Sequence, residues 1–173
     1  HTIQCNRCSY VCPHATIRPF ALTEEEVAAA PEGLQVAKMT GKGLEALKFT
    51  MAVSPMDCMG CGVCVGECPA KEKAIKMVPR ESQEYKQPVF DYLVANVGKK
   101  EGMPAKETVK GSQFEKPLLE FSGSCAGCAE TAYARLISQL FGDRMYISNA
   151  TGCSSIWGGP AATSPYTVNE KGH

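Results

Sequence analysis

Four cysteines between Cys58 and Cys68 constrain this chain more than any other feature. They follow the pattern CxxCxxCxxxCP, which ends at Pro69. Three thiolates on one tight turn can reach three irons of a single [4Fe–4S] cubane, and the fourth cysteine of such a run binds a second cluster. Glycines inside the run let the backbone approach the inorganic sulfides without a Cβ in the way. Cys68 therefore requires a partner motif elsewhere in the chain.

The first thirteen residues supply that partner. Cys5, Cys8 and Cys12 repeat the last three cysteines of the run, and Pro13 follows them as Pro69 follows the other set. The first cysteine of the repeat would fall at position 2, where the chain has Thr2. The spacing resembles that of bacterial-type ferredoxins, so we expect an α+β, 2[4Fe–4S] ferredoxin-like domain over residues 1–78, with two short hairpins and helices around its clusters. Residues 14–57 form a longer insertion between the two motifs.

Crossed ligation, the rule in two-cluster ferredoxins, assigns the thiolates to two sites. One cluster takes Cys58, Cys61, Cys64 and Cys12. The other takes Cys5, Cys8 and Cys68 and lacks its fourth thiolate at Thr2. That second site holds a [3Fe–4S] cluster, a cubane with a non-cysteine ligand, or nothing; the sequence leaves the three open.

Composition narrows the class of protein. The chain has 173 residues with 18 basic and 18 acidic side chains, so its formal net charge is zero and nothing in it favours nucleic acid or a membrane as partner. It shows no apolar run of membrane-spanning length and no signal peptide. Ten cysteines grouped in ligand spacing predict thiolates in a reducing, cytoplasmic compartment rather than disulfides. A zinc site is the alternative for the CxxC pairs.

Local patterns predict a few further elements. A capping box at Thr23-Glu24-Glu25-Glu26 predicts a helix that reaches Ala30, and residues 49–53 read as a strand. Residues 79–116 are charged and polar, which predicts a linker. Within it, Pro88 starts one docking helix whose apolar positions are Val89, Phe90, Leu93 and Val94. For His14 we favour a hydrogen-bonding role over ligation.

A third cysteine group follows. Cys125 and Cys128 form a CxxC pair before a helix with one apolar face, made of Ala132, Tyr133, Leu136, Ile137 and Leu140, and Gly142 ends it. Residues 145–148 read as a strand that leads to a loop with Cys153. By itself the CxxC pair could also be a thioredoxin-type redox dithiol or half of a zinc site.

These segments carry a resemblance. The chain resembles the pyruvate:ferredoxin oxidoreductase family in three stretches downstream of the two-cluster motif, residues 125–131, 140–144 and 149–159. The resemblance covers essentially the whole chain. It implies an internal piece of a much longer enzyme, in which residues 117–173 begin an α/β thiamine-diphosphate-binding domain.

The resemblance also implies roles. Cys125, Cys128 and Cys153 match three ligands of the cluster nearest thiamine diphosphate, whose fourth ligand lies outside this chain. Glu130 and Cys153 match positions beside thiamine diphosphate, although a carboxylate in a first helical turn needs no ligand to be stable. The family's Mg²⁺-holding loop and its pyruvate and coenzyme A sites lie elsewhere. No catalytic residue is therefore expected here, and the segment alone should not turn over.

The implied activity is oxidative decarboxylation of pyruvate with coenzyme A to acetyl-CoA and CO₂. Electrons would pass through the clusters to ferredoxin or flavodoxin, and the enzyme would be a homodimer. The alternatives are another 2-oxoacid:ferredoxin oxidoreductase, a free-standing ferredoxin-type electron carrier whose third cysteine group is a redox dithiol, and a zinc-binding module.

Overall fold

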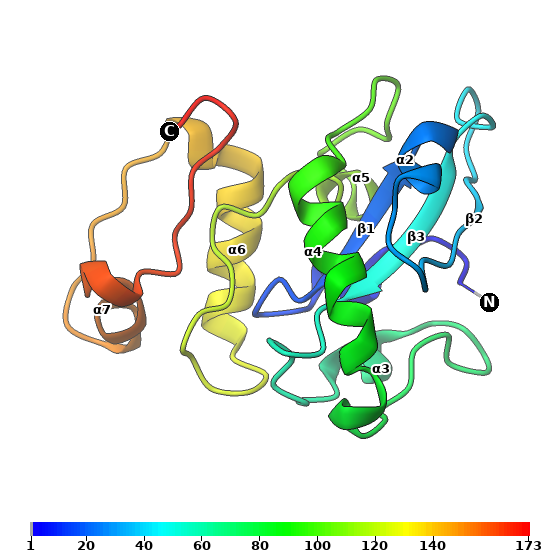
Figure 1. The fold of residues 1–173 in the computed structure, drawn as a ribbon. Helices are drawn as coiled ribbons and strands as arrows, with labels where there is room; N and C mark the ends of the chain where they lie inside the picture. Colours follow the sequence, from blue (N-terminus) through cyan, green and yellow to red (C-terminus); the bar gives the residue numbers. More distant parts are fainter. Residues whose placement is uncertain (1) are drawn as a thin grey trace.

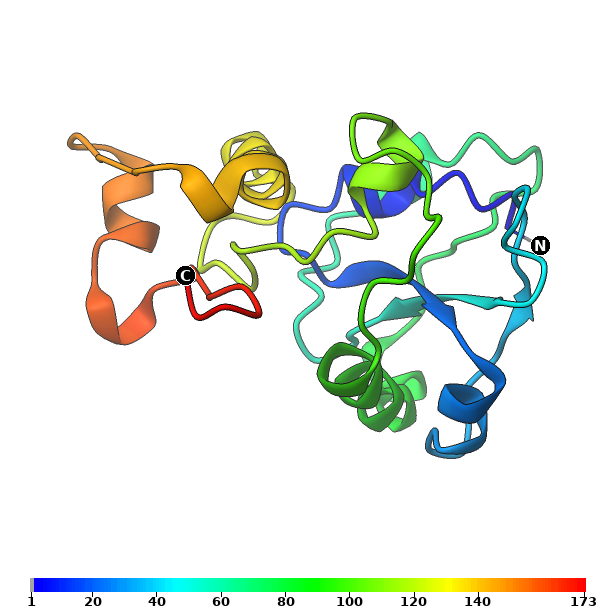
Figure 2. The same cartoon turned by 90° about the horizontal axis from the view of Figure 1, so that it is seen from above.

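The computed structural model describes residues 2–173, which form two lobes that are best separated in the view from above (Figures 1 and 2). The larger lobe holds the sheet and most helices, and the smaller one holds the last third of the chain. The elements, in chain order, are α1 (Arg7–Tyr10), β1 (Ile17–Leu22), α2 (Glu24–Ala28), β2 (Ala37–Lys38), β3 (Lys48–Val53), α3 (Val63–Glu67), the 3-10 turns η1 (Arg80–Ser82) and η2 (Glu84–Lys86), α4 (Gln87–Asn96), α5 (Val109–Ser112), α6 (Ala129–Phe141), η3 (Gly142–Arg144), α7 (Cys153–Gly158) and η4 (Ala161–Thr163).

The sheet has three antiparallel strands in the order β1-β3-β2. Ile17 pairs with Val53 and Leu22 with Lys48, so β1 and β3 run side by side along their full length. The predicted strand over residues 49–53 is confirmed as β3. The expectation of two short hairpins is wrong: the stretch 74–78, which follows the second Cys-Pro, forms no strand. The central strand β3 already has a partner on both sides.

Helix α4 covers one face of the sheet (Figure 1). Its Val89 and Leu93 form a buried cluster with Leu22 of β1. Burial of each such aliphatic side chain contributes about 1.5–3 kcal/mol to folding. The docking helix predicted after Pro88 is confirmed, although Val94 stays 39% exposed.

The opposite face is covered by the stretch that follows α4. Phe114 meets Phe49 edge to face, with ring centroids 6.5 Å apart, and Met103 packs on the same cluster. The segment 79–116 thus packs on both faces of the sheet. Its boundaries as a linker stay a prediction.

The predicted capping box is confirmed at the start of α2. The Thr23 side chain accepts a hydrogen bond from the backbone N–H of Glu26, and the Glu26 carboxylate accepts one from the N–H of Thr23. Lys100 donates a hydrogen bond to the same carboxylate at 2.6 Å. The helix ends earlier than predicted, at Ala28.

The helix predicted after Cys128 is confirmed as α6, with Gly142 at its end, but its buried face is not the apolar one. The buried side chains are Thr131, Arg135, Ser138 and Gln139, whereas Tyr133, Ile137 and Phe141 are 68%, 43% and 47% exposed. A helix in a monomeric protein normally buries its apolar stripe. Here Arg135 and Gln139 find hydrogen-bond partners in Tyr10 and Glu115 of the larger lobe. The apolar stripe is therefore only partly covered: Ala132, Leu136 and Leu140 are half-buried, and Tyr133 and Ile137 are exposed.

The strand predicted over residues 145–148 is wrong. Tyr146 is fully exposed, and the stretch has no hydrogen-bonded neighbour within residues 2–173. An extended segment becomes a strand only when another strand takes up its N–H and C=O groups. No helix in the described part of the chain is long and apolar enough to cross a membrane.

A close backbone approach at Gly111 gives a test of the packing of α5. A Cβ at this position would lie 2.0 Å from the carbonyl oxygen of Ala105. We expect Gly111→Ala to lower the free energy of unfolding by about 1–3 kcal/mol, because the backbone must shift to relieve the overlap. Urea denaturation of the anaerobically purified chain measures this. The matched control is Gly98→Ala, where a Cβ meets nothing within 4 Å; equal stabilities of the two variants would contradict the packing.

Candidate metal centres

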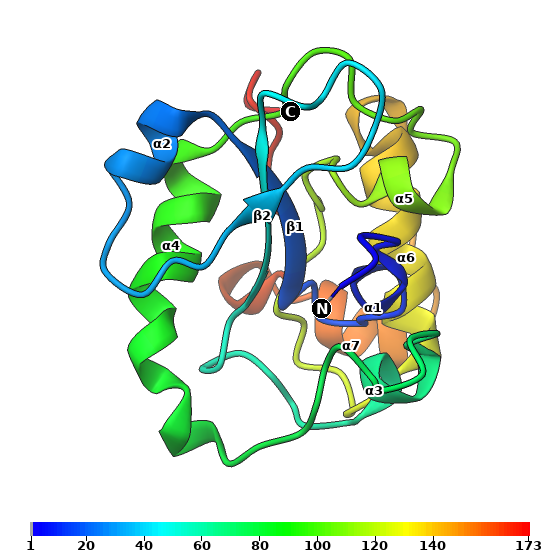
Figure 3. The ribbon, with the colours of Figure 1, turned by 90° about the vertical axis from the view of Figure 1, so that its right-hand side faces the viewer.

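Two short helices, α1 and α3, present the two ferredoxin-type motifs side by side (Figure 3). Each begins directly after a residue in the left-handed backbone region: Asn6 (φ 60°) before α1 and Gly62 (φ 75°) before α3. Glycine adopts this region freely, and asparagine does so more readily than other residues. Arg7 of α1 and Glu67 of α3 form an ion pair at 2.5 Å between the two turns.

The three CxxC-type turns share a second backbone feature. Gly60 precedes Cys61 with φ 67°, Gly127 precedes Cys128 with φ 74°, and Gln4 precedes Cys5 with φ 54°. Gln4 is held in this unusual conformation by its side chain, which hydrogen-bonds Lys38 and Thr40. The backbone before Cys5 thus has the left-handed residue of an intact motif, and Thr2 occupies the place of its first cysteine.

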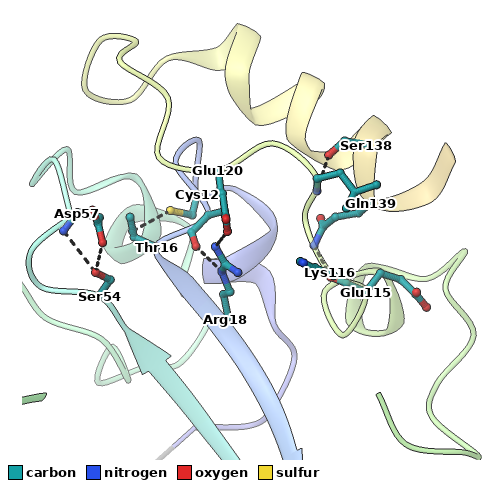
Figure 4. Close-up of polar contacts among 12 residues, drawn as sticks. Cys12, Thr16, Arg18, Ser54, Asp57, Glu115, Lys116, Glu120, Ser138 and Gln139 are labelled. Carbon is teal, nitrogen blue, oxygen red and sulfur yellow. Dashed lines mark hydrogen bonds and ion pairs between the residues drawn. The ribbon is translucent and has the colours of Figure 1, made fainter. Parts of the chain in front are cut away.

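The thiols of the first predicted site lie close together. The pKa of Cys64 is raised to about 11, mainly by burial and in addition by the neighbouring thiols of Cys12, Cys61 and Cys58. These four are the residues that crossed ligation assigns to one cluster. Cys12 is itself buried, and its sulfur lies 3.3 Å from the hydroxyl of Thr16 (Figure 4).

The second predicted site is built from both motifs. Burial raises the pKa of Cys8 to about 11, with Cys5 and Cys64 as the neighbouring thiols. Cys68 behaves differently: burial raises its pKa, but backbone N–H groups of residues 70, 74 and 75 and the ammonium of Lys73 outweigh this and lower it. The N–H of Ala74 donates to the Cys68 sulfur at 3.3 Å. Such donors stabilise a thiolate and would tune a cluster bound there.

A cavity of about 630 Å³ lies between the two motifs, and its lining includes Thr2, Cys5, Cys8, Cys58, Cys64 and Cys68. All ten cysteines are free thiols. Within residues 2–173 no three His, Cys, Asp or Glu side chains converge on a position for a single ion. A cubane carries its irons at separate corners, so its thiolates stand apart. A soft, all-thiol donor set around a cavity of this size fits an iron–sulfur cluster.

The third cysteine group packs directly against the first site. A Cβ built at Gly127 would lie 3.5 Å from the Cβ of Cys61 and 3.5 Å from the Val63 side chain. Burial raises the pKa of Cys128, but hydrogen bonds from Thr131 and Ser124 outweigh it and lower the pKa. The turn before Cys128 therefore lies beside the ferredoxin-type site, and hydrogen bonds favour the thiolate form of Cys128.

A chain of buried hydrogen bonds reaches Cys128 from the first motif. His14 Nδ1 lies 3.1 Å from the carbonyl oxygen of Ser122, the Ser122 and Ser124 hydroxyls are 3.0 Å apart, and Ser124 and Thr131 are again 3.0 Å apart. The hydrogen-bonding role predicted for His14 is confirmed. This chain joins the loop after Cys12 to the start of α6.

The remaining predicted site residues lie farther out. Cys125 and Cys153 are exposed, and Cys153 begins α7. Glu130 is exposed in the first turn of α6. Burial raises the pKa of the Tyr166 phenol, and the nearby charge of Glu130 raises it further. Their roles toward a cofactor stay predictions.

Two arginines at the junction of the lobes were missed by sequence reasoning. Arg18 pairs with Glu120 (Figure 4) and lies 5.5 Å and 5.4 Å from the ring centroids of Phe90 and Phe121. Arg135 is 1% exposed and reaches the carbonyl of Tyr10. The apolar periodicity of α6 pointed to the opposite face, so no sequence signal marked Arg135.

Paired cysteine turns around a shared cavity define the class of a two-cluster, ferredoxin-type electron-transfer domain. In agreement, residues 3–72 match the family of 4Fe-4S dicluster domains. The whole chain is homologous to one segment of larger enzymes. It is 57% identical over 98% of its length to pyruvate-flavodoxin oxidoreductase from Klebsiella pneumoniae and 54% identical over 99% to pyruvate:ferredoxin oxidoreductase from Moorella thermoacetica. It is also 50% identical over 98% to the mitochondrial pyruvate dehydrogenase [NADP(+)] of Euglena gracilis.

The chain spans 14%, 15% and 9% of the lengths of these three relatives. The resemblance predicted from the motifs is therefore confirmed, as is its restriction to one segment. The names of these relatives describe oxidoreductases or a dehydrogenase of pyruvate.

Thr2 offers a test of the second site. We expect Thr2→Cys to raise the iron content of the anaerobically reconstituted chain by about one iron, because a thiolate there would complete a four-cysteine ligand set. Iron and acid-labile sulfide analysis, with electron paramagnetic resonance of the oxidised protein, measures the change. Thr163→Cys, an exposed threonine outside the cavity, is the matched control. An unchanged iron content in Thr2→Cys would contradict a three-iron cluster at the second site of the wild-type chain.

Proposed function

We propose that this chain is the electron-transfer segment of a pyruvate:ferredoxin oxidoreductase. The single observation that supports it is the close approach of Gly127 to Cys61 and Val63, which brings the turn between Cys125 and Cys128 to the four-thiol site of Cys12, Cys58, Cys61 and Cys64. A third cluster bound at Cys128 would be a neighbour of this site. Neighbouring clusters allow one-electron steps along the chain.

The residues that would hold each cluster follow from crossed ligation between the two motifs and, for the third cluster, from the resemblance to the family. Cys12, Cys58, Cys61 and Cys64 would hold one [4Fe–4S] cluster; Cys5, Cys8 and Cys68 a second, lacking a ligand at Thr2; and Cys125, Cys128 and Cys153 a third, with its last ligand outside this chain. When bound, such clusters accept and release single electrons. The chain's own contribution is to hold the thiolates, donate hydrogen bonds to sulfur and exclude water at Cys12 and Cys68.

The smaller lobe is the proposed start of a thiamine-diphosphate-binding domain. Its outward apolar side chains support this, since they need a cover that residues 2–173 do not supply: Tyr133, Ile137, Phe141, Ile147 and Ile156. The rest of the parent enzyme would cover them. It would also bring Glu130 and Cys153 to thiamine diphosphate with its Mg²⁺, bind pyruvate and coenzyme A, and form the homodimer. Catalysis then takes place outside this segment.

The parent would release acetyl-CoA and CO₂ and pass two electrons, one at a time, to ferredoxin or flavodoxin in a reducing cytoplasm. The relatives named above differ in the acceptor that their names give, while this chain is at least 50% identical to each of them over this segment. We therefore place the choice of acceptor largely outside this segment. The choice of 2-oxoacid lies outside it as well, because the substrate site does.

The test uses the full-length parent enzyme. We expect Cys128→Ala to slow reduction of the two ferredoxin-type clusters by pyruvate and coenzyme A at least tenfold, because the first electron acceptor is lost, while dithionite still reduces them fully. Stopped-flow absorbance and electron paramagnetic resonance follow both reactions.

Ser148→Ala, an exposed change on the same lobe, is the control and should behave as the wild type. Unchanged pyruvate-driven reduction in Cys128→Ala would refute the proposed path. Zinc in place of iron and sulfide in the wild type would refute the electron-transfer function itself.

A further inference from the structure

Arg135 is the most deeply buried charged group beside the proposed clusters. Its side chain is 1% exposed, on the polar face of α6. Nη2 donates to the carbonyl oxygen of Tyr10 at 2.5 Å, and Nη1 donates to the amide oxygens of Gln139 at 2.6 Å and Gln113 at 3.0 Å. Tyr10 ends α1, two residues before Cys12. The guanidinium therefore lies against the backbone that carries one proposed cluster ligand.

No carboxylate of residues 2–173 forms an ion pair with Arg135. Both of its side-chain acceptors are neutral amides, which are held in turn by other polar groups. Ser9 donates to Gln113 at 2.9 Å, and Gln139 donates to the carbonyl of Glu115 at 2.9 Å. Nη1 and Nη2 thus have hydrogen-bond partners while the positive charge itself is not neutralised.

A buried charge without a counter-ion costs several kcal/mol. Burial, and after it the repulsion by Arg18, lowers the pKa of Arg135 to about 10, while the thiol of Cys12 and the phenol of Tyr10 act in the other direction. A guanidinium with that pKa still carries its charge at neutral pH. Among the groups that act in that other direction, Cys12 has the largest effect, and as a cluster ligand it would carry a negative charge.

We propose that Arg135 is a positioning residue that raises the reduction potential of the cluster held by Cys12, Cys58, Cys61 and Cys64. Reduction adds one electron, so the negative charge of the cluster and its thiolates increases by one. A fixed positive charge nearby stabilises the reduced form more than the oxidised form. The effect would favour arrival of electrons from the Cys128 side. This inference rests on the proposed ligation of Cys12.

The experiment is a redox titration of the full-length parent, followed by electron paramagnetic resonance of this cluster. We expect Arg135→Gln to lower the equilibrium constant for reduction of this cluster on the order of tenfold. This lowers the reduction potential by about 59 mV for a one-electron couple. Arg135→Lys keeps the charge and should restore most of the potential. Arg144→Gln is the matched control: it removes an exposed arginine that is paired with Asp143 beyond the end of α6, and no shift is expected.

A second variant leaves the arginine in place. Gln139→Glu puts a carboxylate at the atom that Nη1 already contacts, so it neutralises the charge while keeping the hydrogen bond. It should lower the potential of the same cluster as Arg135→Gln does. This variant decides the question if Arg135→Gln fails to fold.

The outcomes separate the two proposals. A wild-type protein without iron and sulfide would overturn the proposed function, and this inference with it. If the wild-type protein contains its clusters but the Gln139→Glu variant has an unchanged potential, the role of Arg135 alone is overturned. An equal drop in every cluster of the protein would also overturn it, because a buried charge beside Cys12 acts most strongly on the nearest cluster.

Discussion

The gathering of free thiols around one cavity is the constraint on which the rest of this structure depends. Cys8 and Cys64 have pKa values near 11, so the cavity disfavours several thiolates at once unless a metal cluster compensates their charge. The sheet, α4 and the stretch to Phe114 form the scaffold that holds α1 and α3 beside this cavity. Binding of clusters and stability of the fold are therefore linked.

The second constraint is the polar junction between the lobes. Helix α6 buries Thr131, Arg135, Ser138 and Gln139 because each finds a partner there. Ser138, for example, accepts the N–H of Leu118, and Gln139 donates to Glu115 (Figure 4). A hydrogen-bonded interface favours one geometry, because its donors and acceptors must stay aligned. It keeps Cys128 in place beside Cys61, and it leaves the apolar stripe of α6 for the parent enzyme.

Local patterns predicted the elements that local chemistry controls. The capping box at Thr23, the strand before Ser54, the helix after Pro88 and α6 up to Gly142 all form, because caps, proline and glycine act on their own neighbours. The predictions that failed were non-local. Residues 145–148 lack a partner strand, and much of the apolar stripe of α6 lacks a cover within the described residues.

The sequence by itself determined the chemistry: cysteine spacing selects an iron–sulfur cluster, and the order of the motifs leads to the family, because both depend only on positions along the chain. Only the tertiary structure decided which thiols are neighbours, that Gln4 gives the Thr2 motif the left-handed turn of an intact one, and that Arg135 lies buried beside the first motif. Arg135 and Tyr10 are far apart in the sequence. Contacts between such residues depend on how the whole chain packs, which no local pattern encodes.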